Sequence, residues 1–256
     1  MSAIAIIPVR MAASRFPGKP MATIHGMPMV GHCYHRTRLA CGLAAVYIAT
    51  CDEEIAEYAR SIGAPAVMTA TTHTRATTRT AEAMHHIEAT TGERAEVVVM
   101  VQGDEPLIRP EAIAETLMHF GDPAVDIVNI MSRLTTYEQF VDRNNVKVVV
   151  NRNNDALYFS REPIPSPWRG IDGVPMYQQT GIIAFRRDVL ARFNAMPETR
   201  LEQIESVDMN RVLETGGRIR MVITDTVTIG VDTPAELDAA GAFIDADPTT
   251  ARYLNR

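Results

Sequence analysis

From Val97 to Pro110 the sequence reads VVVMVQGDEPLIRP. The run of β-branched and apolar residues is typical of a fully buried strand, and it ends abruptly at Gln102 and Gly103. Two acids, Asp104 and Glu105, follow at once, and carboxylates at the tip of a buried strand are costly to desolvate unless a positive group meets them. We therefore expect a cationic partner for Asp104, whereas Glu105 has the alternative of a solvated acid in the turn before proline.

Runs of the same kind alternate with helical patterns through the first half of the chain. The strand-like runs are Ala3–Val9, Ala44–Thr50, Ala64–Thr69 and Ala95–Val101. This alternation is typical of a parallel sheet covered by helices on both faces, in which ligands bind beyond the carboxyl ends of the strands. The loops that begin at Arg10, Thr50, Ala70 and Gln102 are therefore expected at one edge of the molecule.

After about residue 125 the pattern changes to strands with fewer helices between them. The Asn/Asp-rich segment Asn151–Asp155 predicts a hairpin turn. A helix at 201–217, a strand at 219–224 and a final helix from Thr233 complete the chain. We expect one α/β domain whose mostly parallel sheet carries either an antiparallel extension or a small β-rich dimerisation subdomain.

Composition argues against several classes of protein. The chain of 256 residues has a net charge of −6, which disfavours a nucleic-acid-binding surface or a basic membrane-binding face. It shows no leader pattern and no apolar run near the ~18 residues that span a bilayer, so we expect a cytoplasmic protein. Cys33, Cys41 and Cys51 fit neither a disulfide framework nor a zinc site, and we expect small buried apolar residues.

The loop after the first strand, Pro8–Pro20, reads PVRMAASRFPGKP. It places Arg10, Arg15 and Lys19 beside Gly18 and other small residues. Backbone N–H groups and guanidinium groups bind phosphate oxygens while a lysine balances charge, so the loop suits a triphosphate. The pattern is neither a P-loop nor a dinucleotide-binding fingerprint, and a solvated basic surface loop is the alternative.

Two aspartates from distant parts of the chain suit one magnesium ion. Asp104 follows a buried strand, and Asp232 follows Gly230 in the motif IGVDTPAEL. Mg²⁺ prefers hard oxygen ligands with few protein contacts, and beside a triphosphate it bridges phosphate oxygens and polarises phosphorus. The alternative for Asp232 is an N-terminal helix cap before Thr233 and Pro234.

Four motifs in one order carry a family resemblance: IIPVRMAASRFPGKP, VQGDEPLIRP, VKVVVNRNNDALYFSREPIP and IGVDTPAEL. Together they resemble the bacterial CMP-Kdo synthetases, or 3-deoxy-manno-octulosonate cytidylyltransferases, essentially from end to end. The resemblance implies a Rossmann-like nucleotidyltransferase fold, usually a homodimer, that uses CTP, Mg²⁺ and a small acidic acceptor and releases pyrophosphate. Within one domain, residues 1–124 would form the nucleotide-binding half and residues 125–256 the acceptor-binding and dimerisation half.

The resemblance also implies roles for individual residues. Catalysis falls to Arg10 and Lys19, which hold phosphates, and to Asp104 and Asp232, which hold the magnesium. Pro8 and Val9 would line the cytosine pocket through their backbone. The full nucleotide-binding set is Pro8, Val9, Arg10, Arg15, Lys19, Thr77 and Gln102.

The chain departs from the family pattern in three segments, which in the family include residues that face the sugar acid. The pattern D-H-x-S-G-T-E-R is THTRATTR here, so that Arg75 replaces a serine. H-L-G-I-Y becomes QTGII from Gln179, and L-E-Q-L-R becomes VDMNR with Asp208 in place of glutamate. The expected acceptor-binding residues are Arg75, Arg79, Gln179, Thr180, Asp208 and Met209.

Two explanations of these departures are open: drift within an ordinary Kdo enzyme, or a different acceptor. Losing polar partners for a polyhydroxylated ring and gaining Arg75 suits another ulosonic acid or a compact acid such as a phosphonate. A GT-A-like glycosyltransferase is a rival of another class, but it would normally carry an acid-x-acid pair, whereas Asp104 and Glu105 are adjacent. A non-catalytic nucleotide sensor is disfavoured because both proposed metal ligands and the phosphate-binding cations are present.

Overall fold

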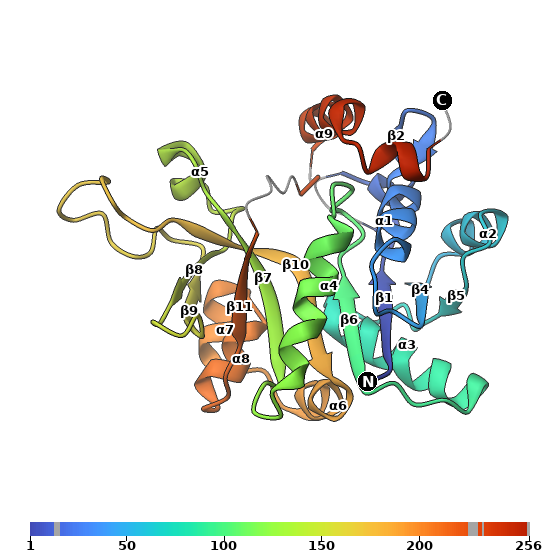
Figure 1. Cartoon of the computed structure of the whole chain (residues 1–256), viewed down its shortest axis with the longest axis horizontal. Coiled ribbons are helices and arrows are strands. Elements are labelled where there is room, and N and C mark those ends of the chain that lie inside the picture. The colour runs from blue at the N-terminus through green and yellow to red at the C-terminus, as the bar shows by residue number, and fades with distance from the viewer. Residues whose placement is uncertain (13–15, 225–229, 232, 255–256) are drawn as a thin grey trace.

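The computed structural model describes residues 1–12, 16–224, 230–231 and 233–254, which form one central sheet with helices on both faces (Figure 1). The strands are β1 (Ala3–Pro8), β2 (Thr23–Ile24), β3 (Met27–Pro28), β4 (Ala45–Thr50), β5 (Ala66–Met68), β6 (Val97–Val101), β7 (Ile127–Arg133), β8 (Lys147–Val150), β9 (Ala156–Ser160), β10 (Tyr177–Arg186) and β11 (Arg220–Thr224). The α-helices are α1 (Met29–Arg38), α2 (Glu53–Ser61), α3 (Ala76–Thr91), α4 (Pro110–Met118), α5 (Tyr137–Val141), α6 (Arg187–Ala195), α7 (Arg200–Glu205), α8 (Met209–Glu214) and α9 (Pro234–Ala246). Short 3₁₀ turns lie at Lys19–Met21, His119–Gly121 and Thr250–Arg252.

The main sheet has the strand order β11-β7-β10-β6-β1-β4-β5 in the described part of the chain. Strands β6, β1, β4 and β5 run parallel, as the alternation of strands and helices predicts. Strand β10 is antiparallel to both of its neighbours, β6 and β7, and it lies inside the sheet rather than in a separate extension. Its residues Ile182–Phe185 are all buried, and they alternate between the two faces of the sheet, so both faces are covered at this strand.

The β8–β9 hairpin extends the sheet beside β10. Its turn at Asn151–Asp155 confirms the hairpin predicted from the sequence. Figure 1 shows the hairpin and the long connection from β9 to β10 projecting from one side of the molecule. The antiparallel addition is therefore present, and its role in dimerisation stays a prediction.

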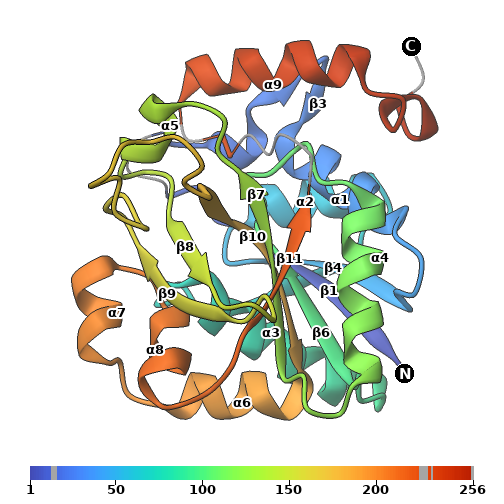
Figure 2. The ribbon, with the colours of Figure 1, turned by 60° about the vertical axis from the view of Figure 1, so that its left-hand side comes forward.

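Two apolar cores lie on opposite faces of the sheet, with α1, α2 and α4 covering one face and α3, α6 and α8 the other (Figure 2). Side chains of β1 alternate between them: Ile7 packs into the first core, and Ile4 and Ile6 into the second. Successive side chains of a strand point to opposite faces, so a run without polar residues requires both faces to be covered. Replacing fully buried Ile6 by alanine is expected to cost about 2–5 kcal/mol of stability.

The helix predicted at 201–217 is two short helices instead of one. The helix is interrupted at Ser206, which adopts the left-handed conformation with φ 53° and ends α7. Glu202 in α7 and Arg211 in α8 then form a buried ion pair, with Nη2 and Oε1 2.5 Å apart. The break turns Asp208, at the start of α8, toward α3, and it matters for the site.

The C-terminal segment packs behind the loop that follows β6. The guanidinium of Arg36 is fully buried and donates to the carbonyl of Ile108, to Asp247 and to Tyr253. The Tyr253 hydroxyl also contacts Nδ1 of His32 at 2.8 Å. Burial lowers the pKa of His32 to about 4, so the ring is neutral and satisfies its partners as a core histidine.

The cysteines and the apolarity of the helices can be compared with the expectations from the sequence. The three cysteines are unpaired, as predicted, but only Cys33 is buried, whereas Cys41 is exposed on the turn after α1 and Cys51 is partly exposed. Within the described part of the chain, no helix has both the length and the apolarity that crossing a membrane requires.

Candidate functional site

Two hollows meet beyond the carboxyl ends of β1 and β6. The first hollow, of about 290 Å³, is bounded by the loop after β1, the start of α3 and the end of β6. The second hollow, of about 360 Å³, lies toward β10 and the segment between α7 and α8. The hollows share a wall formed by Thr74, Arg75, Ala76, Gln102 and Asp104. A ligand that fills both would pass this wall.

The loop after β1 is closed on itself and fixed to the next strand. Gly18 adopts a left-handed conformation with φ 73°, and its N–H donates to the carbonyl of Met11 at 3.0 Å. The N–H of Met11 donates to Oδ2 of Asp52 at 2.8 Å, which anchors the loop beside the end of β4. On the other side, a Cβ added at Gly103 would lie 2.0 Å from Cγ1 of Val9. The two strand ends can approach this closely only with glycine there.

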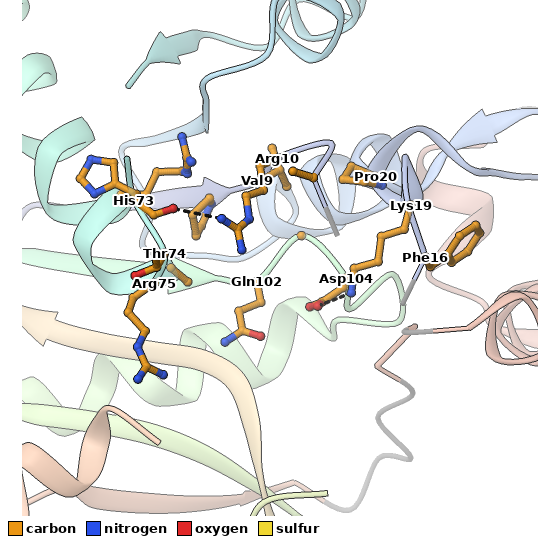
Figure 3. Close-up of a pocket in the computed structure, with 15 residues that line it drawn as sticks. Val9, Arg10, Phe16, Lys19, Pro20, His73, Thr74, Arg75, Gln102 and Asp104 are labelled. Atoms are coloured by element: carbon orange, nitrogen blue, oxygen red, sulfur yellow. Dashed lines mark hydrogen bonds and ion pairs between the residues drawn. The ribbon is translucent and has the colours of Figure 1, made fainter. Parts of the chain in front are cut away.

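Two cations point into the first hollow from this loop (Figure 3). Nη1 of Arg10 donates to the carbonyl of His73 at 3.1 Å, and Nζ of Lys19 lies 2.8 Å from Oδ2 of Asp104. Lys19 is therefore the positive group that the acidic end of β6 requires. The pair is partly exposed, so both charges face the hollow from its rim.

The loop that holds Arg10 is itself held by α3. Glu82 accepts the N–H of Ala70 at 3.1 Å and contacts Nε2 of His73. The other ring nitrogen of His73 contacts the hydroxyl of Thr78 at 2.9 Å. His73 is thereby fixed at both nitrogens, and its carbonyl stays aimed at Arg10.

The start of α3 borders the second hollow with Arg75, and Thr77 nearby binds Asp208, which lines that hollow. The hydroxyl of Thr77 donates to Oδ2 of Asp208 at 2.7 Å. Burial raises the pKa of Asp208, and the bond from Thr77 partly offsets that rise. The side chain of Arg75 extends away from Arg10 (Figure 3), and its Nη1 donates to the carbonyl of Ser206 at 3.4 Å. Arg75 is thus a cation on the wall between the hollows.

The floor of the second hollow is a break in the pairing of β10 with β7. The register shifts between Gln179 and Ile183, and the fully buried Asn129 bridges the break. Its Nδ2 donates to the carbonyl of Thr180 at 3.1 Å, and its Oδ1 accepts from Nε2 of Gln179 at 2.8 Å. The hydroxyl of Thr180 donates to the carbonyl of Ile130 at 3.1 Å, so both predicted side chains are held in place.

One further edge of the second hollow is organised by a buried ammonium group. Nζ of Lys147 donates to the carbonyls of Asp142, Asn145 and Arg161 at 2.8, 2.6 and 2.5 Å. Burial lowers the pKa of Lys147. The side chain fixes the loop before β8 against the end of β9, and Asn145 and Arg161 line the hollow from there.

Glu105 is buried, and its interpretation as a solvated turn residue is wrong. The next residues along the loop, Leu107 and Ile108, are also buried, so the turn after Asp104 is directed into the protein. Burial, with a smaller contribution from neighbouring Asp104, raises the pKa of Glu105 to about 7. Its Oε1 accepts the N–H of Gly181, and Oε2 has no hydrogen-bond partner in the described part of the chain.

Most of the residues singled out in the sequence gather at the two hollows. Those on the first hollow alone are Pro8, Val9, Arg10, Lys19 and Arg79, those on the second alone are Gln179, Thr180 and Asp208, and Arg75, Gln102 and Asp104 line both. Arg79 donates to Thr69 and Cys51 and faces the first hollow, not the second.

Two of the named residues lie elsewhere, and two more are not among the described residues. Thr77 bonds to Asp208 instead of facing the first hollow, and Met209 is fully buried in the core beneath the sheet. Arg15 and Asp232 lie outside the described residues.

Sequence reasoning missed Glu105, Asn129 and Lys147 as parts of this site. Each had a signal that was not used: a polar or charged side chain inside or directly after an apolar strand, as in VKVVV around Lys147. Buried polar groups need partners, so such residues indicate a contact even when its location is unknown.

The chain is similar to known proteins over most of its length. The family model described as cytidylyltransferase matches residues 4–220. The chain is 42% identical over 249 residues to the 3-deoxy-manno-octulosonate cytidylyltransferase of Geobacter metallireducens, covering 93% of this chain and 96% of that one. It is 38% identical over 244 residues to the Escherichia coli protein of the same name, covering 94% and 96%.

Among solved structures, CMP:2-keto-3-deoxy-manno-octonic acid synthetase complexed with CTP superimposes with a TM-score of 0.87 at 38% identity, covering 96% of this chain and 99% of that one. A putative glucose-1-phosphate thymidylyltransferase from Bacillus anthracis reaches 0.68 at 16% identity over 100% of this chain and 97% of that one, which shows the fold alone.

The fold and the cation-lined hollow at the strand ends define a nucleotidyltransferase. With the family model matching most of its length and relatives near 40% identity, the chain belongs to the cytidylyltransferase family. The resemblance first suggested by the four sequence motifs is thereby confirmed.

Proposed function

We propose that the protein transfers the cytidylyl group of CTP to an acidic acceptor, 3-deoxy-manno-octulosonate or a related ulosonic acid, and releases pyrophosphate. The observation that carries this proposal is the common wall of the two hollows. The first hollow has the cations that a triphosphate requires, and the second has polar and cationic side chains that suit a hydroxylated acid. The relatives near 40% identity bear the name of this cytidylyltransferase.

In this proposal the first hollow binds CTP. Arg10 and Lys19 hold phosphate oxygens, and the backbone of Pro8 and Val9 borders the base. Gln102, at the end of β6, lies on the wall between the hollows, where the α-phosphate would sit. Fixing the phosphates by groups that are already held in place lowers the entropic cost of reaching the transition state.

A magnesium ion fits the residues that face this wall. Asp104 supplies a hard carboxylate oxygen at the wall, and its backbone carbonyl accepts the N–H of Val231 at 2.9 Å. Val231 directly precedes Asp232 in the chain, which supports Asp232 as the second ligand. When bound, Mg²⁺ supplies charge neutralisation at the phosphates and polarises the α-phosphorus.

The reaction is an in-line displacement at that phosphorus. An oxygen of the acceptor forms a bond to the α-phosphorus, the bond to the β-phosphate oxygen breaks, and the acceptor's proton is released. Arg10 and Lys19 stabilise the charge that develops on the leaving pyrophosphate. The second hollow orients the acceptor, with Gln179 and Thr180 on its floor.

The direct test is pyrophosphate release by the purified protein with CTP, Mg²⁺ and 3-deoxy-manno-octulosonate. ATP, GTP and UTP serve as matched nucleotide controls, and CTP without an acid measures background hydrolysis. We expect release that requires both CTP and an acid. Consumption of CTP in the absence of any acid, or in an exchange with a nucleotide-sugar donor, would contradict the proposal.

A second candidate acceptor is a compact, more strongly anionic acid such as a phosphonate. The supporting observation is that the three departures from the family pattern are distant in sequence but share the second hollow, through Arg75, Gln179 and Asp208. Unrelated drift at surface positions has no reason to converge on one hollow. A site with altered hydrogen-bonding partners rejects the original ligand strongly.

The two acceptors are separated by one competition experiment. The protein is given CTP, Mg²⁺ and equal concentrations of 3-deoxy-manno-octulosonate and a small phosphonate panel, and the CMP conjugates are identified by mass spectrometry. A low Michaelis constant for 3-deoxy-manno-octulosonate would remove the second candidate. Turnover of a phosphonate with little turnover of the sugar acid would remove the first.

We also propose a homodimer, which rests on the family resemblance. Large apolar side chains are exposed on the part of the molecule with the β8–β9 hairpin, where Trp168 is 88% and Ile204 65% exposed. Light scattering during gel filtration measures the mass directly, and a mass near 28 kDa would contradict a dimer.

A further inference from the structure

The loop after β6 and the break in β10 are joined by an unusually close backbone contact. The carbonyl of Gly181 accepts the N–H of Gln102 at 3.0 Å, and the N–H of Gly181 donates to Oε1 of Glu105. A Cβ added at Gly181 would lie 2.7 Å from both Oε1 of Glu105 and Cβ of Gln102. Both backbone polar groups of Gly181 are therefore bound to the loop that contains Asp104.

The contact with Glu105 occurs where β10 has lost its regular pairing. Between Gln179 and Ile183 the ladder to β7 shifts register, so backbone groups there need other partners. On the β7 side, Nδ2 of Asn129 donates to the carbonyls of Thr180 and Ile182. On the β6 side, Glu105 accepts from Gly181. The break is held from both sides by one buried side chain each.

This break supplies the floor of the second hollow, while Gln102 and Asp104 supply the wall that it shares with the first. We propose that Glu105 is a positioning residue that holds the acceptor-binding segment Gln179–Thr180 at a fixed distance from the reacting phosphate, acting through the N–H of Gly181. The inference rests on the proposed function, because it assigns the second hollow to the acceptor.

The chemistry of the carboxyl group separates this role from direct participation. Positioning needs an oxygen that reaches the N–H of Gly181, whereas metal binding or proton transfer needs the carboxylate itself. Glu105→Gln keeps the reach and one carbonyl oxygen but removes the charge. Glu105→Asp keeps the charge but withdraws the oxygen by one carbon–carbon bond, roughly 1.5 Å. The two variants therefore test reach against charge.

For Glu105→Gln we expect Michaelis constants for CTP and for the acceptor within about threefold of wild type. For Glu105→Asp we expect the Michaelis constant for the acceptor to rise about tenfold or more, with that for CTP within about threefold, as befits one lost buried hydrogen bond. The reverse ranking of the two variants, or equal rises for CTP and acceptor, would overturn the positioning role.

Hydrogen exchange at the Gly181 amide gives a readout that does not depend on catalysis. Protection of this amide should persist in Glu105→Gln and fall in Glu105→Asp, while the melting temperatures of both variants monitor the fold. Unchanged protection in Glu105→Asp contradicts the contact. If the wild-type protein turns over no acid, the proposed function fails, and the exchange measurement still decides whether Glu105 holds Gly181.

Discussion

The first and second hollows are built in different ways. Residues of the first hollow lie within a short distance in sequence of a strand end, as Arg10 does after β1 and Asp104 after β6. The second hollow is lined by segments that are far apart in the chain, among them α3, β10 and the link between α7 and α8. The first hollow therefore follows from sheet topology, whereas the second follows from contacts between distant segments.

The only two lysines of the chain show the same contrast. Lys19 lies on the rim of the first hollow beside a carboxylate, where its charge faces the hollow. Lys147 is fully buried, and its ammonium group donates hydrogen bonds to three backbone carbonyls beside the second hollow. Mutations on the first side should therefore change chemistry, and mutations on the second should change which acid is accepted.

The largest effect is expected for Asp104→Asn, which keeps the shape of the side chain and removes its charge. We expect kcat to fall by about 10³-fold or more, because the metal that would neutralise the phosphates loses a carboxylate ligand. Stability should change by only about 1 kcal/mol, since the ion pair with Lys19 is partly exposed. Steady-state pyrophosphate release measures the effect, with Glu115→Gln on the exposed face of α4 as control. Activity within tenfold of wild type would remove Asp104 from the metal site.

A smaller effect is expected for Lys19→Ala. Loss of the ammonium group should lower kcat/KM for CTP by about 10²-fold, because a charge-assisted bond to phosphate is lost. The Michaelis constant for the acceptor should stay within about threefold. Arg152→Ala, an exposed cation in the hairpin turn, is the matched control. A rise confined to the acceptor would show that the two hollows are assigned the wrong way round.

Arg75→Ser, which restores the residue of the family pattern, is expected to act on the acceptor alone. If the acceptor is compact and strongly anionic, kcat/KM for it should fall by about tenfold or more, since one charged hydrogen bond is removed. The Michaelis constant for CTP should change little. A comparable loss of 3-deoxy-manno-octulosonate turnover in this variant would instead favour the sugar acid as the natural acceptor.

The smallest effect is expected for the pH dependence of stability, through the buried ring of His32. The folded-state pKa of His32 is about 4, below its usual value of 6.5, so the unfolded chain binds the proton first as the pH falls. The free energy of unfolding should therefore fall by about 1 kcal/mol between pH 7 and pH 5.5 from this group. Urea unfolding of the wild type and of His32→Gln measures the difference. Identical pH slopes for the two proteins would contradict a buried neutral ring.

Local sequence patterns were sufficient for the parallel half of the molecule. Alternating apolar runs and helical segments predicted β1, β4, β5 and β6, and the carboxyl ends of parallel strands converge by geometry. Arg10, Lys19 and Asp104 could be placed together for that reason, without knowledge of a single contact. The position of β10 between β6 and β7 could not be predicted in this way, because strand order depends on which strand edges pair, and those partners are distant in the chain.

The partners of buried polar groups are the part that sequence reasoning did not reach. Thr77 and Asp208 are 131 residues apart, and Glu105 and Gly181 are 76 apart, yet the first pair forms a partly buried and the second a buried hydrogen bond. A polar residue in an apolar run indicates that its side chain needs a hydrogen-bond partner, but many groups in the chain could be that partner. Which one does so depends on side-chain packing around the break in β10 and the turn at Ser206, where backbone geometry is fixed by distant segments.

The amino-acid pattern was thus enough to fix the strands, the ligand-binding edge, the cations and the carboxylate of the first hollow, since periodicity and strand direction are local properties. The folded arrangement was needed to show that Glu105 is buried, that Thr77 serves Asp208, and that the departures at Arg75, Gln179 and Asp208 share one hollow. These are properties of three-dimensional proximity, and no local preference of the chain encodes them.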